Sequence, residues 1–126
     1  MNNNTILVVD DSAVMRQMNR AVLEAGGYRV LLAEDGDSAL ALLRQEPVAL
    51  VLTDWTMAPM DGGEFTRQLR QLPYGLSLPL LVLSTISSGD AKDQARAAGA
   101  NGWLCKPIEP ETLLAVIASL MTESAA

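Results

Sequence analysis

The sequence predicts a single α/β domain built on a parallel β-sheet with helices on both faces. Five short apolar runs alternate with segments of helical periodicity across the 126 residues. Continuous apolar runs bounded by turn-forming residues are typical of strands that are buried on both faces. Strands that alternate with helices at this spacing are joined by right-handed crossovers, which make the sheet parallel and cover both of its faces. A chain of this length can bury one core, so we expect one domain over residues 1–126.

The first two strand–helix units follow from local signals. Residues 6–9 are the first apolar run, and Ser12 is placed to cap a helix that continues until Gly26-Gly27. Residues 28–33 form the second strand. A second helix follows, and Asp37 is its expected N-cap. Both helices repeat their apolar residues every three or four positions, as a helix packed on a sheet requires.

Three more units complete the prediction. The third strand is the apolar run that begins at Val48 and is closed by Asp54. The helix after it carries Phe65, Leu69 and Leu72 on one side. The remaining elements are expected at residues 80–83 (strand), 87–98 (helix), 102–105 (strand) and from 110 onward (helix). The fourth helix offers mainly alanine to the core, so it buries little apolar area and should be the most weakly anchored helix.

The composition excludes several classes of function. The chain has no histidine, which rules out imidazole bases, histidine-ligated metals and a histidine phosphocarrier role. The formal net charge is −6 and the nine Lys and Arg residues are dispersed, so nucleic-acid binding is not expected. The apolar residues are too scattered for a membrane span, and the N-terminus lacks the basic segment of a signal peptide. One cysteine suits a reducing compartment, and we expect a cytoplasmic protein.

Polar and charged residues stand at the carboxyl ends of four of the five predicted strands. These residues are Asp10, Asp11, Asp54, Ser84 and Lys106. In a parallel sheet such ends meet at one edge, where open α/β sheets bind ligands. A single aspartate after a strand is more simply explained as a turn or helix-capping residue. The convergence of the whole set favours a functional site instead.

The charges of this set predict both a metal and a reaction. Two carboxylates about 4 Å apart repel by roughly 4 kcal/mol at an effective dielectric constant of 20, so three clustered carboxylates should be protonated or bind a cation. Oxygen ligands with space for water favour Mg²⁺, whereas zinc requires nitrogen or sulfur ligands. A carboxylate beside Mg²⁺ can attack phosphorus, and Lys106 would stabilise the negative charge of the transferred group. The expected product is an aspartyl phosphate, toward which the Ser84 hydroxyl would be drawn.

Taken together, these residues resemble the receiver domain of two-component response regulators, especially the single-domain chemotaxis type. The resemblance rests on Asp10-Asp11, residues 54–62, Ser84 and Lys106-Pro107, which follow one another in the order and at the separations of the family. It implies a flavodoxin-like (βα)5 fold, a three-layer sandwich whose five-stranded parallel sheet has the order 2-1-3-4-5.

The resemblance also assigns roles at the acidic edge. Asp54 would accept a phosphoryl group from a histidine kinase or a histidine phosphotransfer protein. Mg²⁺ would be bound by Asp11, Asp54 and the backbone carbonyl of Thr56, with Asp10 acting directly or through water. The protein would assist its own phosphorylation and dephosphorylation without being an enzyme that acts on other substrates.

Three further residues complete the implied site. Ser84 and Lys106 would contact the phosphoryl oxygens, and the Lys106-Pro107 peptide bond is expected to be cis. Trp103 stands where the family has an aromatic residue coupled to the hydroxyl residue, and it is either a switch or plain packing. The loop departs from the family in having Ala58 before the proline.

We therefore expect a phosphorylatable signalling switch without an output domain. It would change its affinity for a protein partner through the fourth helix, fifth strand and fifth helix, with no membrane or nucleic acid involved. Two alternatives stay open. A Mg²⁺-dependent phosphatase that forms an aspartyl phosphate is disfavoured, because such enzymes have Asp-x-Asp where this chain has Asp10-Asp11. A pseudo-receiver that binds partners without being phosphorylated is disfavoured by the complete set of site residues.

Overall fold

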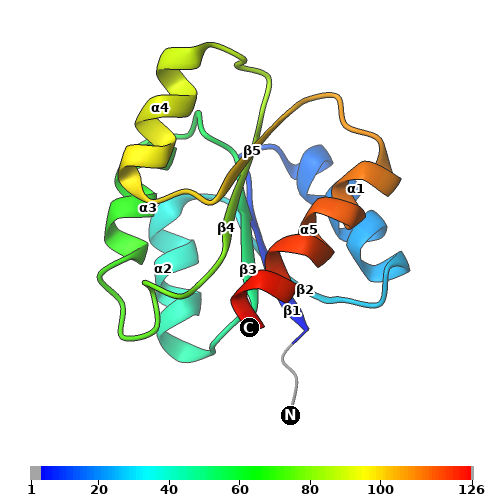
Figure 1. Cartoon of the computed structure of the whole chain (residues 1–126). Helices are drawn as coiled ribbons and strands as arrows, with labels where there is room; N and C mark the ends of the chain where they lie inside the picture. Colours follow the sequence, from blue (N-terminus) through cyan, green and yellow to red (C-terminus); the bar gives the residue numbers. More distant parts are fainter. Residues whose placement is uncertain (1–3, 126) are drawn as a thin grey trace.

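Five strands and five helices alternate along the chain, as the sequence predicts (Figure 1). The computed structural model describes residues 4–125. The strands are β1 (Thr5–Val9), β2 (Arg29–Ala33), β3 (Leu50–Thr53), β4 (Leu80–Ser84) and β5 (Gly102–Cys105). The helices are α1 (Ala13–Ala25), α2 (Gly36–Gln45), α3 (Gly62–Leu69), α4 (Gly89–Ala98) and α5 (Pro110–Ala125). None of the described helices combines the length and apolar character needed to cross a membrane.

The strands form one parallel sheet in the order β2-β1-β3-β4-β5, which confirms the predicted order. Every residue of β1, β3 and β4 is buried, whereas every residue of the edge strand β5 is only partly buried. Because all strands run the same way, their carboxyl ends lie at one edge, the upper edge of the sheet in Figure 1.

The helices cover the two faces of the sheet in separate layers (Figure 1). On one face, which carries α2, α3 and α4, Phe65 packs in a core with Val51 of β3. On the other face, Leu23 of α1 and Ile117 of α5 pack in a second core with Leu52 of β3. Neighbouring residues of one strand therefore face different cores, which explains why the strand sequences are continuously apolar. The predicted three-layer arrangement is confirmed.

The helix caps agree with the sequence in one case and differ in another. Ser12 caps α1 as predicted, since its hydroxyl accepts a hydrogen bond from the Met15 N–H over 3.2 Å. The prediction that Asp37 caps α2 is wrong. Asp35 is the N-cap, and its carboxylate accepts a hydrogen bond from the Ser38 N–H over 2.7 Å. Asp37 lies in the first helical turn, where a negative charge still favours the helix N-terminus.

Three element boundaries differ from the predicted ones by two residues or more, whereas β1, β2 and β4 each differ by one residue at one end. β3 begins at Leu50, and α4 begins at Gly89 because Ser88 is its N-cap. Each start is two residues later than predicted. α3 ends at Leu69, so Leu72 lies beyond the helix, although it packs against the same core.

Helix α4 is weakly anchored, as the sequence predicts. Ala95 is the only buried residue among the ten residues of this helix. An alanine side chain removes little apolar area from water, so the hydrophobic contribution of α4 to stability is small.

Candidate functional site

Three site residues extend the hydrogen-bond ladder of the sheet by one residue past their own strands. The backbone N–H of Asp10 donates a hydrogen bond to β2 over an N···O distance of 3.1 Å. The N–H of Asp54 donates to β1 over 2.9 Å, and the N–H of Lys106 donates to β4 over 2.8 Å. The backbone is thus fixed where these side chains leave the sheet. Their positions at the carboxyl edge are set by the sheet itself.

Asp10, Asp11 and Asp54 form an acidic cluster at this edge. One carboxylate oxygen from each residue lies within 4.8 Å of the others. The Lys106 Nζ atom lies 3.3 Å from Asp10 Oδ2 and 3.6 Å from Asp54 Oδ2. The structure therefore brings four of the predicted residues together. Three carboxylates and one ammonium leave a formal charge of −2 (−3 + 1) when all are ionised.

Asp10 is held from several sides. It is 3% exposed, and its Oδ1 atom accepts a hydrogen bond from the Ser12 N–H over 2.9 Å. Its backbone carbonyl accepts a hydrogen bond from Arg16 Nη1 over 2.7 Å. Asp11, in contrast, is exposed. Asp10 is thus a fixed charge that positions Lys106, whereas the Asp11 side chain is free to adjust to a ligand.

Asp54 is oriented by the backbone of its own loop. Its Oδ1 atom accepts hydrogen bonds from the N–H groups of Trp55 (2.7 Å) and Thr56 (3.4 Å). Burial raises the pKa of the Asp54 carboxyl above its ordinary value of 3.8, and the attraction of Lys106 only partly offsets this effect. The nearby charge of Asp10 raises the pKa further. A cation in the cluster would stabilise the ionised form of this carboxylate.

The residues present fit a hard divalent cation. The cluster offers three carboxylate groups and no nitrogen or sulfur ligand, and oxygen-only sets are preferred by Mg²⁺, Ca²⁺ and Mn²⁺. Thr56, which the family resemblance implies as a carbonyl ligand, follows Asp54 closely enough for its N–H to contact that carboxylate. Its side chain is exposed, so any contribution to a metal site comes from its backbone.

Ser84 is buried at the end of β4, next to β3 in the sheet. Because Thr53 pairs with Val82, Ser84 lies one residue farther out than Asp54. Its hydroxyl oxygen accepts a hydrogen bond from the Ile86 N–H over 3.2 Å. The hydroxyl proton is not needed for that bond, so it remains available to a ligand above the edge.

Trp103 connects the edge strand β5 to the loops that follow β3 and β4. Its indole Nε1–H donates a hydrogen bond to the Ile86 carbonyl over 2.9 Å. Its ring packs against the ring of Trp55, with centroids 5.5 Å apart and planes inclined by 57°. The predicted coupling of Trp103 to Ser84 therefore has a physical route through Ile86. The pairing of the two tryptophans was not predicted, because β4 separates their strands.

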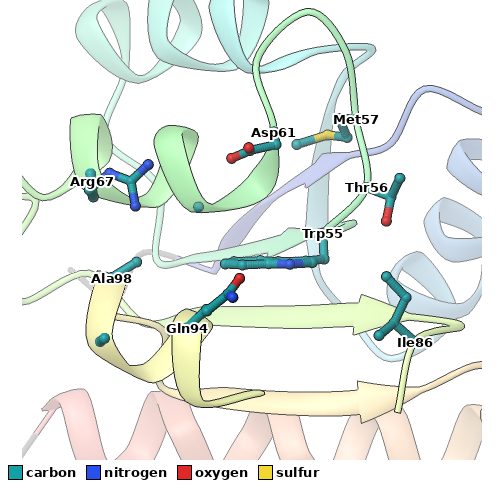
Figure 2. Close-up of a pocket in the computed structure, with 10 residues that line it drawn as sticks. Trp55, Thr56, Met57, Asp61, Arg67, Ile86, Gln94 and Ala98 are labelled. Carbon is teal, nitrogen blue, oxygen red and sulfur yellow. The ribbon is translucent and has the colours of Figure 1, made fainter. Parts of the chain in front are cut away.

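A cleft of about 520 Å³ opens between α3 and α4 beside the cluster. Figure 2 shows the Trp55 indole along this cleft, with Gln94 of α4 near the ring and with Thr56 and Ile86 at one end. The ring lies close to the start of α3 because Gly62 has no side chain: a Cβ atom there would lie 2.8 Å from Trp55 atoms. The half-buried indole is thus placed between the acidic cluster and α4.

The two loops beside the cluster each contain a cis proline. The Lys106-Pro107 bond is cis, as the resemblance implies, and so is the Ala58-Pro59 bond, where the chain departs from the family. Met57 is buried, and Asp61 caps α3 by accepting a hydrogen bond from the Glu64 N–H over 2.8 Å. Asp61 is therefore a capping residue outside the acidic cluster.

Comparisons with known proteins agree with this geometry. A family profile described as the response regulator receiver domain matches residues 6–118. Protein PilH of Pseudomonas aeruginosa is 36% identical over 116 residues, which cover 92% of this chain and 96% of PilH. The phosphate regulon transcriptional regulatory protein PhoB of the same organism is 32% identical over 96% of this chain, which spans only 53% of PhoB. The solved structure of the chemotaxis protein CheY4 of Vibrio cholerae is 37% identical, with a TM-score of 0.91 over 94% of this chain and 99% of that one.

Proposed function

The chain belongs to the family of response regulator receiver domains, and we propose that it works as a phosphorylatable signalling switch. In this proposal Asp54 accepts a phosphoryl group from a histidine kinase or a histidine phosphotransfer protein. The observation that carries the proposal is the position of Asp54 Oδ2, 3.6 Å from Lys106 Nζ and beside two further carboxylates at the ligand-binding edge.

The cluster is proposed to hold Mg²⁺ during the reaction. Asp11, Asp54 and the backbone carbonyl of Thr56 would bind the ion, with Asp10 contributing directly or through water. When bound, the ion supplies positive charge that offsets the repulsion between the carboxylates and the incoming phosphoryl group. The oxygen-only donor set and its formal charge of −2 with Lys106 support this choice of metal.

The protein's own groups perform the transfer by position and charge. A carboxylate oxygen of Asp54 attacks phosphorus, and the new P–O bond forms as the P–N bond to the donor imidazole breaks. The electron pair of the broken bond stays on the imidazole nitrogen. The Lys106 ammonium stabilises the charge on the phosphoryl oxygens, while the N–H of Trp55 keeps the carboxylate oriented. Later attack by water on phosphorus breaks the P–O bond to Asp54, releases inorganic phosphate and returns the free carboxylate. The chain is therefore proposed to regulate its own state rather than to act as an enzyme on other substrates.

Phosphorylation is proposed to reach the surface through Ser84. A phosphoryl oxygen on Asp54 would accept a hydrogen bond from the Ser84 hydroxyl and draw the following loop toward the site. Ile86 would move with it, because its N–H is bonded to Ser84 and its carbonyl to Trp103. The segments affected are the start of α4 and the middle of β5. These elements, together with α5, form the proposed partner surface.

The partner is proposed to be a protein. A hollow of about 210 Å³ between α4 and β5 is lined by Lys92, Arg96 and Trp103 among others, and offers both charge and an aromatic surface. A chemotaxis-type role is proposed because the chain is 37% identical to the chemotaxis protein CheY4, with a TM-score of 0.91. A cytoplasmic location is proposed because a single cysteine suits a reducing compartment. The net charge of −6 is consistent with a switch that acts through protein contacts rather than on nucleic acid.

The proposal is tested by treating the purified chain with a small phosphodonor and measuring its intact mass. The wild-type chain should gain one phosphoryl group with Mg²⁺ and none when the metal is chelated. Asp54→Ala should gain none, whereas Asp61→Asn, which keeps the α3 cap, should behave as wild type. Labelling of Asp54→Ala at the wild-type rate would contradict the proposal. Steady hydrolysis of phosphate monoesters would favour the phosphatase alternative.

A further inference from the structure

Arg70 joins separate parts of the chain at the C-terminal end of α4. It is the half-buried C-cap residue of α3. Its guanidinium donates hydrogen bonds to four acceptors, the backbone carbonyls of Gly75, Leu78 and Gly99 and the side-chain carbonyl of Asn101. These acceptors come from the loop after α3, the end of α4 and the residue before β5. One side chain therefore links three segments, and the planar fork of five N–H groups makes arginine suited to that task.

The end of α4 is fitted closely to this guanidinium. Gly99 closes the helix in the left-handed conformation with φ of 115°, and its carbonyl lies 2.6 Å from Arg70 Nη2. A Cβ atom at position 99 would lie 3.0 Å from Arg70 Nε, so the glycine allows the close approach. Asn101 is tied in turn to Leu80, whose N–H donates to Asn101 Oδ1 over 2.8 Å. The C-terminal end of α4 is thus bound to α3, β4 and β5.

The N-terminal end of α4 has no comparable attachment among the described residues. Ser88 and Gly89 are exposed, and the Ser88 hydroxyl accepts its hydrogen bond from Ala91 of the same helix over 3.2 Å. The Ser88 carbonyl likewise accepts from the Lys92 N–H within the helix. A Cβ atom added at Gly89 would meet no heavy atom within 4 Å. No hydrogen bond or ion pair of the described residues joins the first turn of α4 to another element, and Ala91 and Lys92 are only partly buried.

Space is available along both sides of α4. The cleft of about 520 Å³ lies along the side that carries Gln94 and Ala98, and the hollow of about 210 Å³ lies along the side that carries Lys92 and Arg96. Figure 2 shows the first of these spaces between α4 and α3. A helix that is fixed at one end, has one buried alanine and borders a hollow on each side can swing about its fixed end.

We propose that Arg70 is the positioning residue that fixes the C-terminal end of α4, so that phosphorylation moves the N-terminal end about this point. The trigger rests on the proposed function of Asp54, whereas the anchoring by Arg70 does not. When the first turn of α4 moves, Lys92, which lines the hollow beside β5, is displaced more than any other residue that lines it. The region around Gly99, at the fixed end, stays in place. The partner surface is thus remodelled at one end only.

Hydrogen exchange measured by mass spectrometry tests the anchor without any ligand. In the wild-type chain, residues 95–101 should exchange more slowly than residues 87–92. Arg70→Met removes the donors and keeps the aliphatic stem, and it should raise exchange at 95–101 by about tenfold, since charged hydrogen bonds are lost. Arg70→Lys retains a single ammonium and should give a smaller rise. Arg67→Met, an exposed arginine of the same helix whose bonds go to Glu64, should leave both segments unchanged.

The same chains are then treated with Mg²⁺ and beryllium fluoride, which mimics a phosphoryl group on a carboxylate. In the wild-type chain, beryllium fluoride should change the hydrogen-exchange rate of residues 85–93 but not that of residues 95–101. In Arg70→Met, it should change the exchange rate of both segments. Wild-type changes of equal size at both ends, or unaltered exchange at 95–101 in both Arg70 variants, would overturn the inference. If Arg70→Met does not fold, Arg70→Lys and Asn101→Ala, which removes one acceptor, still distinguish these outcomes. A wild-type chain that shows no response to beryllium fluoride overturns the proposed function and the trigger, while the ligand-free comparison still decides whether Arg70 anchors α4.

Discussion

Helices α3 and α4 lie side by side on one face of the sheet, yet they are attached to it in different ways. Five of the eight residues of α3 are buried, against one of the ten residues of α4. The strands next to them differ in the same sense. Every residue of β3 is buried, whereas every residue of β5 is only partly buried. The side of Asp54 formed by β1, β3 and α3 is therefore rigid, and the side formed by α4 and β5 is weakly held.

This difference separates the chemistry from the response. Asp10 and Asp54 emerge from fully buried strands, where the backbone ladder fixes their positions. The start of α4 lies where little apolar area resists movement, and Trp103 of the partly buried strand β5 is bonded to the loop that leads into this helix. Segments with few buried contacts open at lower free energy than core segments, and moving elements are drawn from them. A rigid acidic cluster beside a weakly held helix is the arrangement that a phosphorylation switch requires.

The largest expected effect is on the free energy of unfolding, when substitutions in the cores under the two helices are compared. Phe65→Ala in α3 should lower the free energy of unfolding by about 3–5 kcal/mol, because it leaves a cavity at a fully buried position. Ala95→Gly in α4 should lower it by about 1 kcal/mol, mainly through helix propensity. Urea denaturation measures both values. A cost for Ala95→Gly that equals the cost for Phe65→Ala would show that α4 is not weakly held.

The second prediction concerns metal binding by the rigid side. Mg²⁺ at 100 times its Kd should raise the free energy of unfolding by about 2.7 kcal/mol, since the ion binds only the folded cluster. Asp11→Asn should remove most of this gain, because it deletes an exposed charge without disturbing the core. Asp61→Asn, an acidic residue outside the cluster, is the matched control. Denaturation with Mg²⁺ and with chelator gives the comparison, and equal gains in both variants would contradict a metal site in the cluster.

The smallest expected effect is a pH dependence of the free energy of unfolding in the absence of metal. Folding raises the pKa of Asp54 through burial, so the folded state favours the protonated carboxyl. The stability that this group contributes is present at low pH and is lost as the pH rises through the folded pKa. Asp54→Asn should therefore stabilise the chain at neutral pH, and the gain should vanish as the pH falls toward 3.8. Denaturation of both chains across this range in chelator tests the sign, and a gain that persists at low pH would contradict it.

The sequence predicted the fold and the acidic cluster for the same geometric reason. Once the apolar runs are assigned as parallel strands, the residues that follow them must meet at one edge. Asp10, Asp54 and Lys106 therefore come together although they are far apart along the chain. The small apolar area of α4 was also predictable, because alanine leaves no larger side chain to bury.

Other features depend on backbone geometry that the sequence does not encode in a recognisable pattern. Asp35 caps α2 instead of Asp37 because Asp35 is the residue with an extended backbone before the helix. The contact between Trp55 and Trp103 crosses the end of an intervening strand, so neither neighbour pairing nor periodicity predicts it. Arg70 binds mainly backbone carbonyls, which every residue carries, and its role therefore leaves no sequence motif.

The two tryptophans allow the rigid and the weakly held sides to be followed separately in one titration. Trp103→Phe leaves Trp55, whose N–H contacts the Asp54 carboxylate, and Trp55→Phe leaves Trp103 on β5. Fluorescence is recorded as Mg²⁺ and then beryllium fluoride are added, with Asp54→Ala introduced into each variant as the control. Trp55 should respond to Mg²⁺ alone, whereas Trp103 should respond only after beryllium fluoride, and both responses should be absent without Asp54. A Trp103 signal that responds fully to Mg²⁺ alone, or that does not respond to beryllium fluoride, would contradict the separation of a rigid phosphoacceptor site from a mobile output surface.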